Sequence, residues 1–173
     1  ITGDCADSAQ GNELDWVIQL MNGEPGLHTD SGDDDDPVPG PDNDPKDPFI
    51  ADGLSMPWFW VTGNHDILNQ GNIPPAIKES EYLGSYAAVG ARNWSEPGGP
   101  VILGDIPPDP QRAALFGPDL LTTIKADGDG HGITDDAITR GRAFYSFDPT
   151  PKLRVIVLDT AALTGLLVWT GGA

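Results

Sequence analysis

The sequence is short of cysteine, of cations and of long apolar runs. Cys5 is the single cysteine among 173 residues, so no disulfide can form within the chain. Lysine and arginine number 9 against 27 aspartates and glutamates, which gives a formal net charge of −18 at pH 7. A surface of that sign repels phosphate backbones and anionic lipids, which argues against nucleic-acid wrapping and membrane docking. No run of about 18 apolar residues is present to cross a bilayer.

The rest of the composition predicts a folded domain with long loops. A chain of 173 residues can bury roughly 70% of the surface that it exposes when unfolded, which is enough for a core. Glycine and proline make up about 23% of the residues, just under the level at which low-complexity disorder becomes the usual state. The negative charge would repel a phosphorylated ligand, so phosphate chemistry here requires local positive charge, such as bound metal cations.

The N-terminal residues predict a strand, a polar loop and a helix. Residues 1–4, Ile-Thr-Gly-Asp, are typical of a buried strand that ends in a loop, where α/β sheets present ligands. We expect Asn12 to cap the helix and Gly23 to end it, because apolar residues recur at helical spacing between them. The chain opens without a methionine, in what resembles the middle of a strand. We therefore expect it to be an internal piece of a longer protein.

An acidic segment follows this helix. Residues 30–47 hold eight aspartates against one lysine, with prolines scattered among them, so we expect an exposed loop insertion over about residues 24–53. Calcium binding by Asp42, Asp44 and Asp47 is the alternative, because clustered carboxylates suit a hard cation. The glycine expected at the sixth position of a helix-loop-helix calcium loop is replaced by Asp47, and no glutamate closes that loop.

The middle of the chain predicts a second strand and one further helix. Residues 57–62, Pro-Trp-Phe-Trp-Val-Thr, form an aromatic and β-branched run that indicates a buried strand ending at Gly63. We expect a helix over residues 77–89. Residues 91–132 are rich in glycine and proline and predict irregular structure.

A hairpin is predicted near the C-terminal end of the sequence. Residues 142–147 and 153–158 are rich in apolar and aromatic side chains and flank a proline-containing turn. The second segment is nearly all apolar, so we expect a central strand that is buried on both faces and followed by Asp159.

Polar motifs follow two of the predicted strands. Gly-Asp stands at residues 3–4, and Gly-Asn-His-Asp stands at residues 63–66. Asp4 alone would be typical of a turn. Asn64 offers a neutral amide oxygen to a metal ion, and the adjacent His65 can give a proton near neutral pH.

Taken together, residues 1–7, Ile-Thr-Gly-Asp-Cys-Ala-Asp, and residues 61–66, Val-Thr-Gly-Asn-His-Asp, resemble the calcineurin-like metallophosphoesterase superfamily. Members carry Asp-x-His, Gly-Asp-x-x-(Asp/Asn/Tyr), Gly-Asn-His-(Asp/Glu), a single His and Gly-His-x-His, in that order. This chain has the second and third motifs. Residues 7–14, 144–148 and 156–160 also resemble bacterial members, for which export from the cell would be compatible.

The resemblance implies a role for each residue of the two motifs. Asp4 would bridge two divalent metal ions (Mn, Fe, Zn or Mg), and Asn64 would bind one of them through its side-chain oxygen. His65 would bind the phosphate of a small phosphorylated substrate and protonate the leaving oxygen. Its carboxylate partner would be Asp7 or Asp66, and Asp66 could equally fix the loop. An aspartate at position 7, where purple acid phosphatases have a tyrosine, argues against that subgroup.

The other histidines do not complete the family's pattern. His131 stands in Gly-His-Gly-Ile, where the second histidine of Gly-His-x-His is replaced by Ile133, so we interpret it as a loop residue. His28 is expected at the surface. Asp-x-His would belong before residue 1, and the single His and Gly-His-x-His would belong after residue 173. With Asp4 and Asn64 as the only ligands, we expect weak metal binding and no activity from this chain by itself.

The resemblance implies an α/β fold, with residues 1–173 as a single partial domain of a four-layer αββα sandwich that carries long irregular insertions. The implied activity is metal-dependent hydrolysis of a phosphate mono- or diester. One alternative is a non-catalytic acidic module that binds calcium or a basic protein partner through residues 30–47. A second is a degenerate family member that has kept the fold and lost its ligands.

Overall fold

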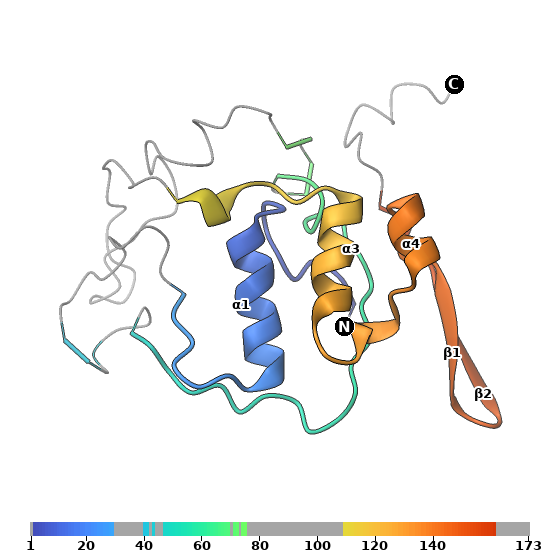
Figure 1. Cartoon of the computed structure of the whole chain (residues 1–173), viewed down its shortest axis with the longest axis horizontal. Helices are drawn as coiled ribbons and strands as arrows, with labels where there is room; N and C mark the ends of the chain where they lie inside the picture. Colours follow the sequence, from blue (N-terminus) through green and yellow to red (C-terminus); the bar gives the residue numbers. More distant parts are fainter. Residues whose placement is uncertain are drawn as a thin grey trace. The chain divides into compact units, whose positions relative to one another are not determined.

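A computed structural model describes residues 2–29, 40, 41, 43, 47–69, 71, 72, 74, 75 and 109–161 (Figure 1). They form helices and one two-stranded antiparallel sheet, which confirms a mixed α and β composition. The chain divides into two compact units: Ile1–Ile18, Leu54–Pro75 and Ala114–Ala173 in the first, Gln19–Gly53 and Ala76–Ala113 in the second. The elements in chain order are α1 (Gly11–Asn22), η1 (Pro110–Arg112), α3 (Gly117–Ala126), η2 (Gly130–Gly132), α4 (Asp135–Arg140), β1 (Tyr145–Thr150) and β2 (Leu153–Val157).

The first predicted helix is confirmed as α1, with a different start. Leu14 and Ile18 are buried, as their helical spacing predicted, and Gly23 follows the last turn with a left-handed φ of 74°. The prediction that Asn12 caps the helix was wrong, because α1 begins at Gly11 and Asn12 is buried inside its first turn. The carboxylate of Glu13 instead accepts the backbone N–H groups that precede the helix.

The predicted insertion is closed at its base within the second unit. Leu27 and Phe49 exchange both backbone hydrogen bonds, with N–H to O distances of 2.8 and 3.0 Å, and Leu27 is buried. Gly23 and Gly53 approach so closely that a Cβ on Gly53 would lie 2.6 Å from the backbone nitrogen of Gly23. Residues 30–39, 42 and 44–46 lie outside the described residues. They include Asp42 and Asp44 of the calcium alternative.

The strand predicted over residues 57–62 is absent, although the segment is extended. Trp58, Trp60 and Thr62 are buried in alternation, as in a strand. The backbone N–H of Trp60 donates to the carbonyl of His131 at 3.0 Å, so this segment is hydrogen-bonded to η2 and not to a neighbouring strand. The sequence pattern predicted the extended backbone correctly, but a strand also requires a paired partner, and the described residues supply none here.

The prediction of irregular structure over residues 91–132 was wrong where α3 forms. Pro118 stands in its first turn, a favourable place because its missing N–H would have no helical partner there. Leu120, Leu121 and Ile124 are buried and hold the helix against the core of the first unit. The helix predicted over residues 77–89 lies outside the described residues.

The predicted hairpin is confirmed, with shifted bounds, as β1 and β2. Tyr145 pairs with Val157, and Phe147 pairs with Val155. The expectation of a strand buried on both faces was wrong, because Leu153 is 54% exposed and Ile156 is 67% exposed. Within the described part of the chain β2 pairs with β1 alone, so no further strand or helix covers its outer face.

Candidate functional site

The two sequence motifs meet in the first unit through their glycines. Both Gly3 and Gly63 lie at a close approach of the two loops: a Cβ on Gly3 would lie 2.8 Å from the Gly63 nitrogen. A Cβ on Gly63 would lie 2.1 Å from Oδ1 of Asp4, far inside van der Waals contact. Glycine is therefore required at both positions for the Asp4 loop to lie against the segment that carries Asn64 and His65.

Asp66 ties the two loops together. Its Oδ1 accepts the N–H groups of Cys5 at 2.8 Å and Ala6 at 2.9 Å, and its Oδ2 accepts those of Asp4 at 3.0 Å and Gly63 at 2.8 Å. The carboxyl group is fully buried, and this burial raises its pKa, while the four N–H donors oppose that effect by favouring the charged form. With both oxygens bound by backbone amides, Asp66 holds the loop and is not the partner of His65.

Asp7 is the carboxylate that partners His65. Nδ1 of His65 lies 2.9 Å from Oδ1 of Asp7, and the two side chains are 33% and 67% exposed. The hydrogen bond to Asp7 raises the pKa of His65, and the charge of nearby Asp4 acts in the same direction. Because Asp7 accepts from Nδ1, Nε2 is the ring nitrogen left for a ligand, and it carries a proton when the ring is positively charged.

The side chain of Asp4 is set by its backbone and by His65. Its φ of 55° is left-handed, which costs a residue with a Cβ about 1–2 kcal/mol. Oδ1 of Asp4 accepts the backbone N–H of His65 at 3.0 Å. Among the described residues no hydrogen bond engages Oδ2 of Asp4, so this oxygen is available to a cation.

Asn64 is oriented by Gly71. Its Nδ2 donates to the carbonyl oxygen of Gly71 at 2.8 Å, which turns Oδ1 to the opposite side of the amide. Gly71 also has a φ of 69°, and a Cβ there would lie 2.4 Å from Nδ2 of Asn64 and from Nε2 of His65. Gly71 is thus a glycine that keeps both side chains in place.

The oxygens of Asp4 and Asn64 fit a divalent cation in kind, because carboxylate and amide oxygens suit Mg²⁺ and Mn²⁺. Two side chains are too few to hold two cations, because each cation normally needs several protein ligands. In the described ranges no group of three or more His, Cys, Asp or Glu side chains could hold a metal ion. Among the residues that the structure describes, Asp4 and Asn64 could therefore supply only part of the ligand set of a cation pair.

The remaining predicted residues are structural or exposed. His131 is buried, stacks on Trp58 with ring centroids 3.3 Å apart, and lies 2.7 Å from Asp127 through Nε2. It lies within η2, where the motif was interpreted as a loop, and its two ring nitrogens lie within hydrogen-bond distance of the Trp58 carbonyl and the Asp127 carboxylate. His28 is exposed, as expected. Cys5 is half-buried, and burial beside Asp66 raises its pKa to about 11, so its thiol stays protonated.

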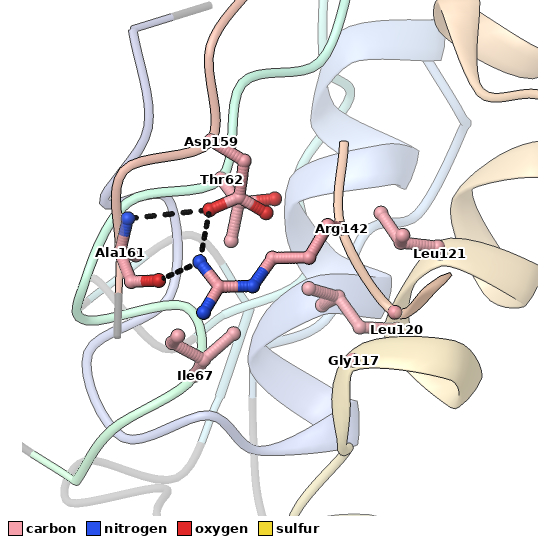
Figure 2. Close-up of a pocket in the computed structure, with 9 residues that line it drawn as sticks. Thr62, Ile67, Gly117, Leu120, Leu121, Arg142, Asp159 and Ala161 are labelled. Carbon is pink, nitrogen blue, oxygen red and sulfur yellow. Dashed lines mark hydrogen bonds and ion pairs between the residues drawn. The ribbon is translucent and has the colours of Figure 1, made fainter. Parts of the chain in front are cut away.

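A small pocket, lined in part by residues on either side of Asn64 in the sequence, was not anticipated from the sequence. Thr62 and Ile67 line it, and Figure 2 shows the guanidinium of Arg142 directed between Asp159 and Ala161. Nη1 of Arg142 lies 3.8 Å from Oδ1 of buried Asp159 and donates to the Ala161 carbonyl. Asp159 was noted only as a polar residue after a strand. Here it anchors the chain that follows β2, by accepting the N–H groups of Ala143 and Ala161.

Comparison with known proteins adds no relative. No protein-family model, no curated protein and no solved structure matches the chain. None of the helices in the described segments has the length and apolar character that a bilayer crossing requires.

Proposed function

We propose that this chain contributes part of the dinuclear metal site of a phosphoester hydrolase, a phosphatase or phosphodiesterase of the calcineurin-like kind. One observation carries the proposal: Asp66 clasps the Asp4 loop against the segment bearing Asn64 and His65. That clasp leaves an oxygen of Asp4, the Oδ1 of Asn64 and the imidazole of His65 for a ligand.

Asp4 and Asn64 would hold the cations. Two divalent ions bound there would supply the positive charge that the phosphoryl group requires and would activate a water molecule for in-line attack. The protein has a formal charge of −18, so its surface repels an anionic substrate. Bound cations would provide a local positive charge that attracts the phosphate. The remaining metal ligands would come from the three family motifs that this sequence lacks: Asp-x-His, the single His and Gly-His-x-His.

His65 and Asp7 carry the proton transfer in this proposal. Asp7 keeps the proton on Nδ1 of His65 in place and raises the pKa of the ring, so that Nε2 can be protonated near neutral pH. That nitrogen hydrogen-bonds the phosphate and donates its proton to the leaving oxygen as the ester bond breaks. Asp66 acts indirectly, because it holds the backbone from which Asp4 projects.

The fold proposed for the complete domain is the four-layer sandwich expected from the resemblance. The outward apolar side chains of β2, among them Ile156, support it, because a larger sheet or a covering layer would remove them from water. The extended segment that holds Trp58 and Trp60 supports it as well, since its alternating burial suits a strand in a larger sheet.

The test is an assay of the full-length gene product for hydrolysis of aryl phosphates with added Mn²⁺. We expect metal-dependent turnover that falls by about a hundredfold or more in Asp4→Ala and in Asn64→Ala, because each removes a metal ligand. Absence of turnover, or turnover indifferent to both substitutions, would sink the proposal. Reading the gene on both sides of this sequence gives an independent check, because Asp-x-His should precede it and Gly-His-x-His should follow it.

The charge of the insertion supports one rival function, binding of calcium or a basic partner through residues 30–47. Calorimetric titration with Ca²⁺ separates the two functions. Tight binding that is abolished when residues 30–47 are deleted, in a gene product without phosphatase activity, would favour the rival.

A further inference from the structure

We propose that Glu13 is a positioning residue that holds Asp7 against His65, a role that rests on the proposed hydrolase function. Oε2 of Glu13 accepts the N–H groups of Ser8 at 2.9 Å, Asp7 at 3.2 Å and Gln10 at 3.3 Å. A single carboxylate thus gathers three amides of the loop between the Asp4 motif and α1.

This bonding exceeds what a helix cap requires. Glu13 is the third residue of α1, the position from which a capping-box glutamate reaches back to the N–H of the capping residue, here Gln10. The other two donors, Asp7 and Ser8, lie two to three residues farther from the helix. Glu13 therefore fixes the path of the loop as well as the start of α1.

The position of the Asp7 side chain depends on that path. Within the described residues its carboxylate makes one hydrogen bond, the one to Nδ1 of His65, and the side chain is 67% exposed. Because two thirds of the side chain is exposed, packing restrains it little and its backbone largely sets where it lies. The loop is also held from the other side, because the buried residue Ala9 donates its N–H to the carbonyl of His65 at 3.2 Å.

Loss of the Glu13 carboxylate would free three N–H groups and let Asp7 move away from His65. A displacement of about 1 Å at a reacting group can lower a rate about a hundredfold. The loss should appear only where the leaving oxygen needs a proton, because Asp7 acts through His65. Alkyl phosphates have basic leaving groups and depend on that proton. The dinitrophenolate released from dinitrophenyl phosphate is weakly basic and leaves without it.

The first measurement follows the loop directly, in this chain, by amide hydrogen exchange and by the Nδ1 proton resonance of His65. In Glu13→Ala we expect the amides of Asp7, Ser8 and Gln10 to exchange about tenfold faster or more, and the Nδ1 resonance to be lost. Glu13→Gln keeps an acceptor oxygen and should restore most of the protection. Asp15→Ala, which removes an exposed carboxylate from the same helix, is the matched control and should change neither signal.

The second measurement compares leaving groups in the full-length gene product. We expect Glu13→Ala to lower kcat for an alkyl phosphate about tenfold to a hundredfold, with KM within about twofold, and to leave dinitrophenyl phosphate nearly unchanged. Asp7→Ala should show the same selectivity, and the double variant should lose little more than either single one, because both act through one contact.

The outcomes separate this role from the hydrolase function. Unchanged exchange in Glu13→Ala would overturn the positioning role, whether or not the protein is a phosphatase. Faster exchange with an equal loss on both substrates would overturn it too, and would leave Glu13 as a helix cap only. Wild-type protein without turnover, combined with loss of the His65 Nδ1 resonance in Glu13→Ala, would refute the hydrolase function and keep the positioning of Asp7.

Discussion

The loop over residues 4–10 and the hairpin of β1 and β2 are held by opposite means. In the loop, every backbone N–H from Asp4 to Gln10 has an acceptor, supplied by two carboxylates and one carbonyl: Asp66, Glu13 and the oxygen of His65. In the hairpin the backbone pairing is local, with long-range contacts from Tyr145 and Phe147 of β1, and Leu153 and Ile156 of β2 are 54% and 67% exposed.

The comparison shows which kind of interaction determines the structure of each region. A loop that has no regular structure is held by two charged side chains, of which Glu13 is near in sequence and Asp66 is 61 residues from Cys5. The hairpin has regular structure but leaves its apolar outer face in water. Polar contacts therefore define the candidate site, whereas the apolar outer side chains of β2 are the observation behind the proposed larger sheet.

The largest effect should follow removal of Asp66. Asp66→Ala leaves four N–H donors without their acceptor in a buried place, so we expect the free energy of unfolding to fall by about 3–5 kcal/mol. Urea denaturation followed by tryptophan fluorescence measures it. A loss under about 1 kcal/mol would mean that the loop is not held by this carboxylate.

A smaller loss is expected from a methyl group placed between the motifs. Gly63→Ala must push Asp4 away, because the new Cβ would lie 2.1 Å from Oδ1 and 2.4 Å from the nitrogen of that residue, and we expect a cost of about 1–3 kcal/mol. Gly128→Ala is the control for metal affinity: its φ of 42° makes alanine cost about 1–2 kcal/mol, but no atom lies within 4 Å of the new Cβ. Metal affinity should fall in the Gly63 variant alone, and equal affinity in both would contradict the account.

A third effect concerns proton binding more than stability. Asp7 raises the pKa of His65, so Asp7→Asn should lower it, as measured by the imidazole resonances in an NMR titration. In the wild type the pair stabilises the fold below the unfolded-state pKa of histidine, and this contribution is lost as the pH rises through the raised folded-state value. Asp7→Asn should flatten that pH dependence. A pKa that does not move would show that Asp7 is not the partner.

The smallest effect belongs to the hairpin. Ile156→Thr replaces a 67% exposed apolar side chain with another β-branched one, so the free energy of unfolding of this chain should change by no more than about 0.5 kcal/mol. Val157→Ala, at a buried position of the same strand, is the comparison and should cost about 1–2 kcal/mol more. A large loss for Ile156→Thr in this chain would mean that the outer face is covered after all.

Elements formed by residues close in sequence could be predicted better than contacts between segments far apart in the chain. α1 and the hairpin were predicted because the apolar spacing of each lies within a few residues. α3 was missed, because glycine and proline around it and the paired residues Thr122 and Thr123 obscured the helical spacing of its leucines. The extended segment with Trp58 and Trp60 was taken for a strand, since its pattern carries no information on pairing.

The residues of the candidate site could be predicted from the sequence, but their hydrogen-bond partners could not. Asp4, Asn64 and His65 were identified from their motifs. The choice between Asp7 and Asp66 as the partner of His65 depended on which carboxylate the backbone amides surround, and no spacing rule encodes that. The role of Glu13 was not predicted, although its capping-box spacing from Gln10 was visible in the sequence.

The central claim is that Asp4 bridges two metal ions beside Asn64. Electron paramagnetic resonance of the Mn²⁺-loaded full-length gene product tests it, because two manganese ions joined by one carboxylate couple magnetically. We expect the spectrum of a coupled pair in the wild type, with conversion to the six-line spectrum of isolated Mn²⁺ in Asp4→Asn. An isolated-ion spectrum in the wild type at full metal occupancy, unaltered by Asp4→Asn, would contradict the account.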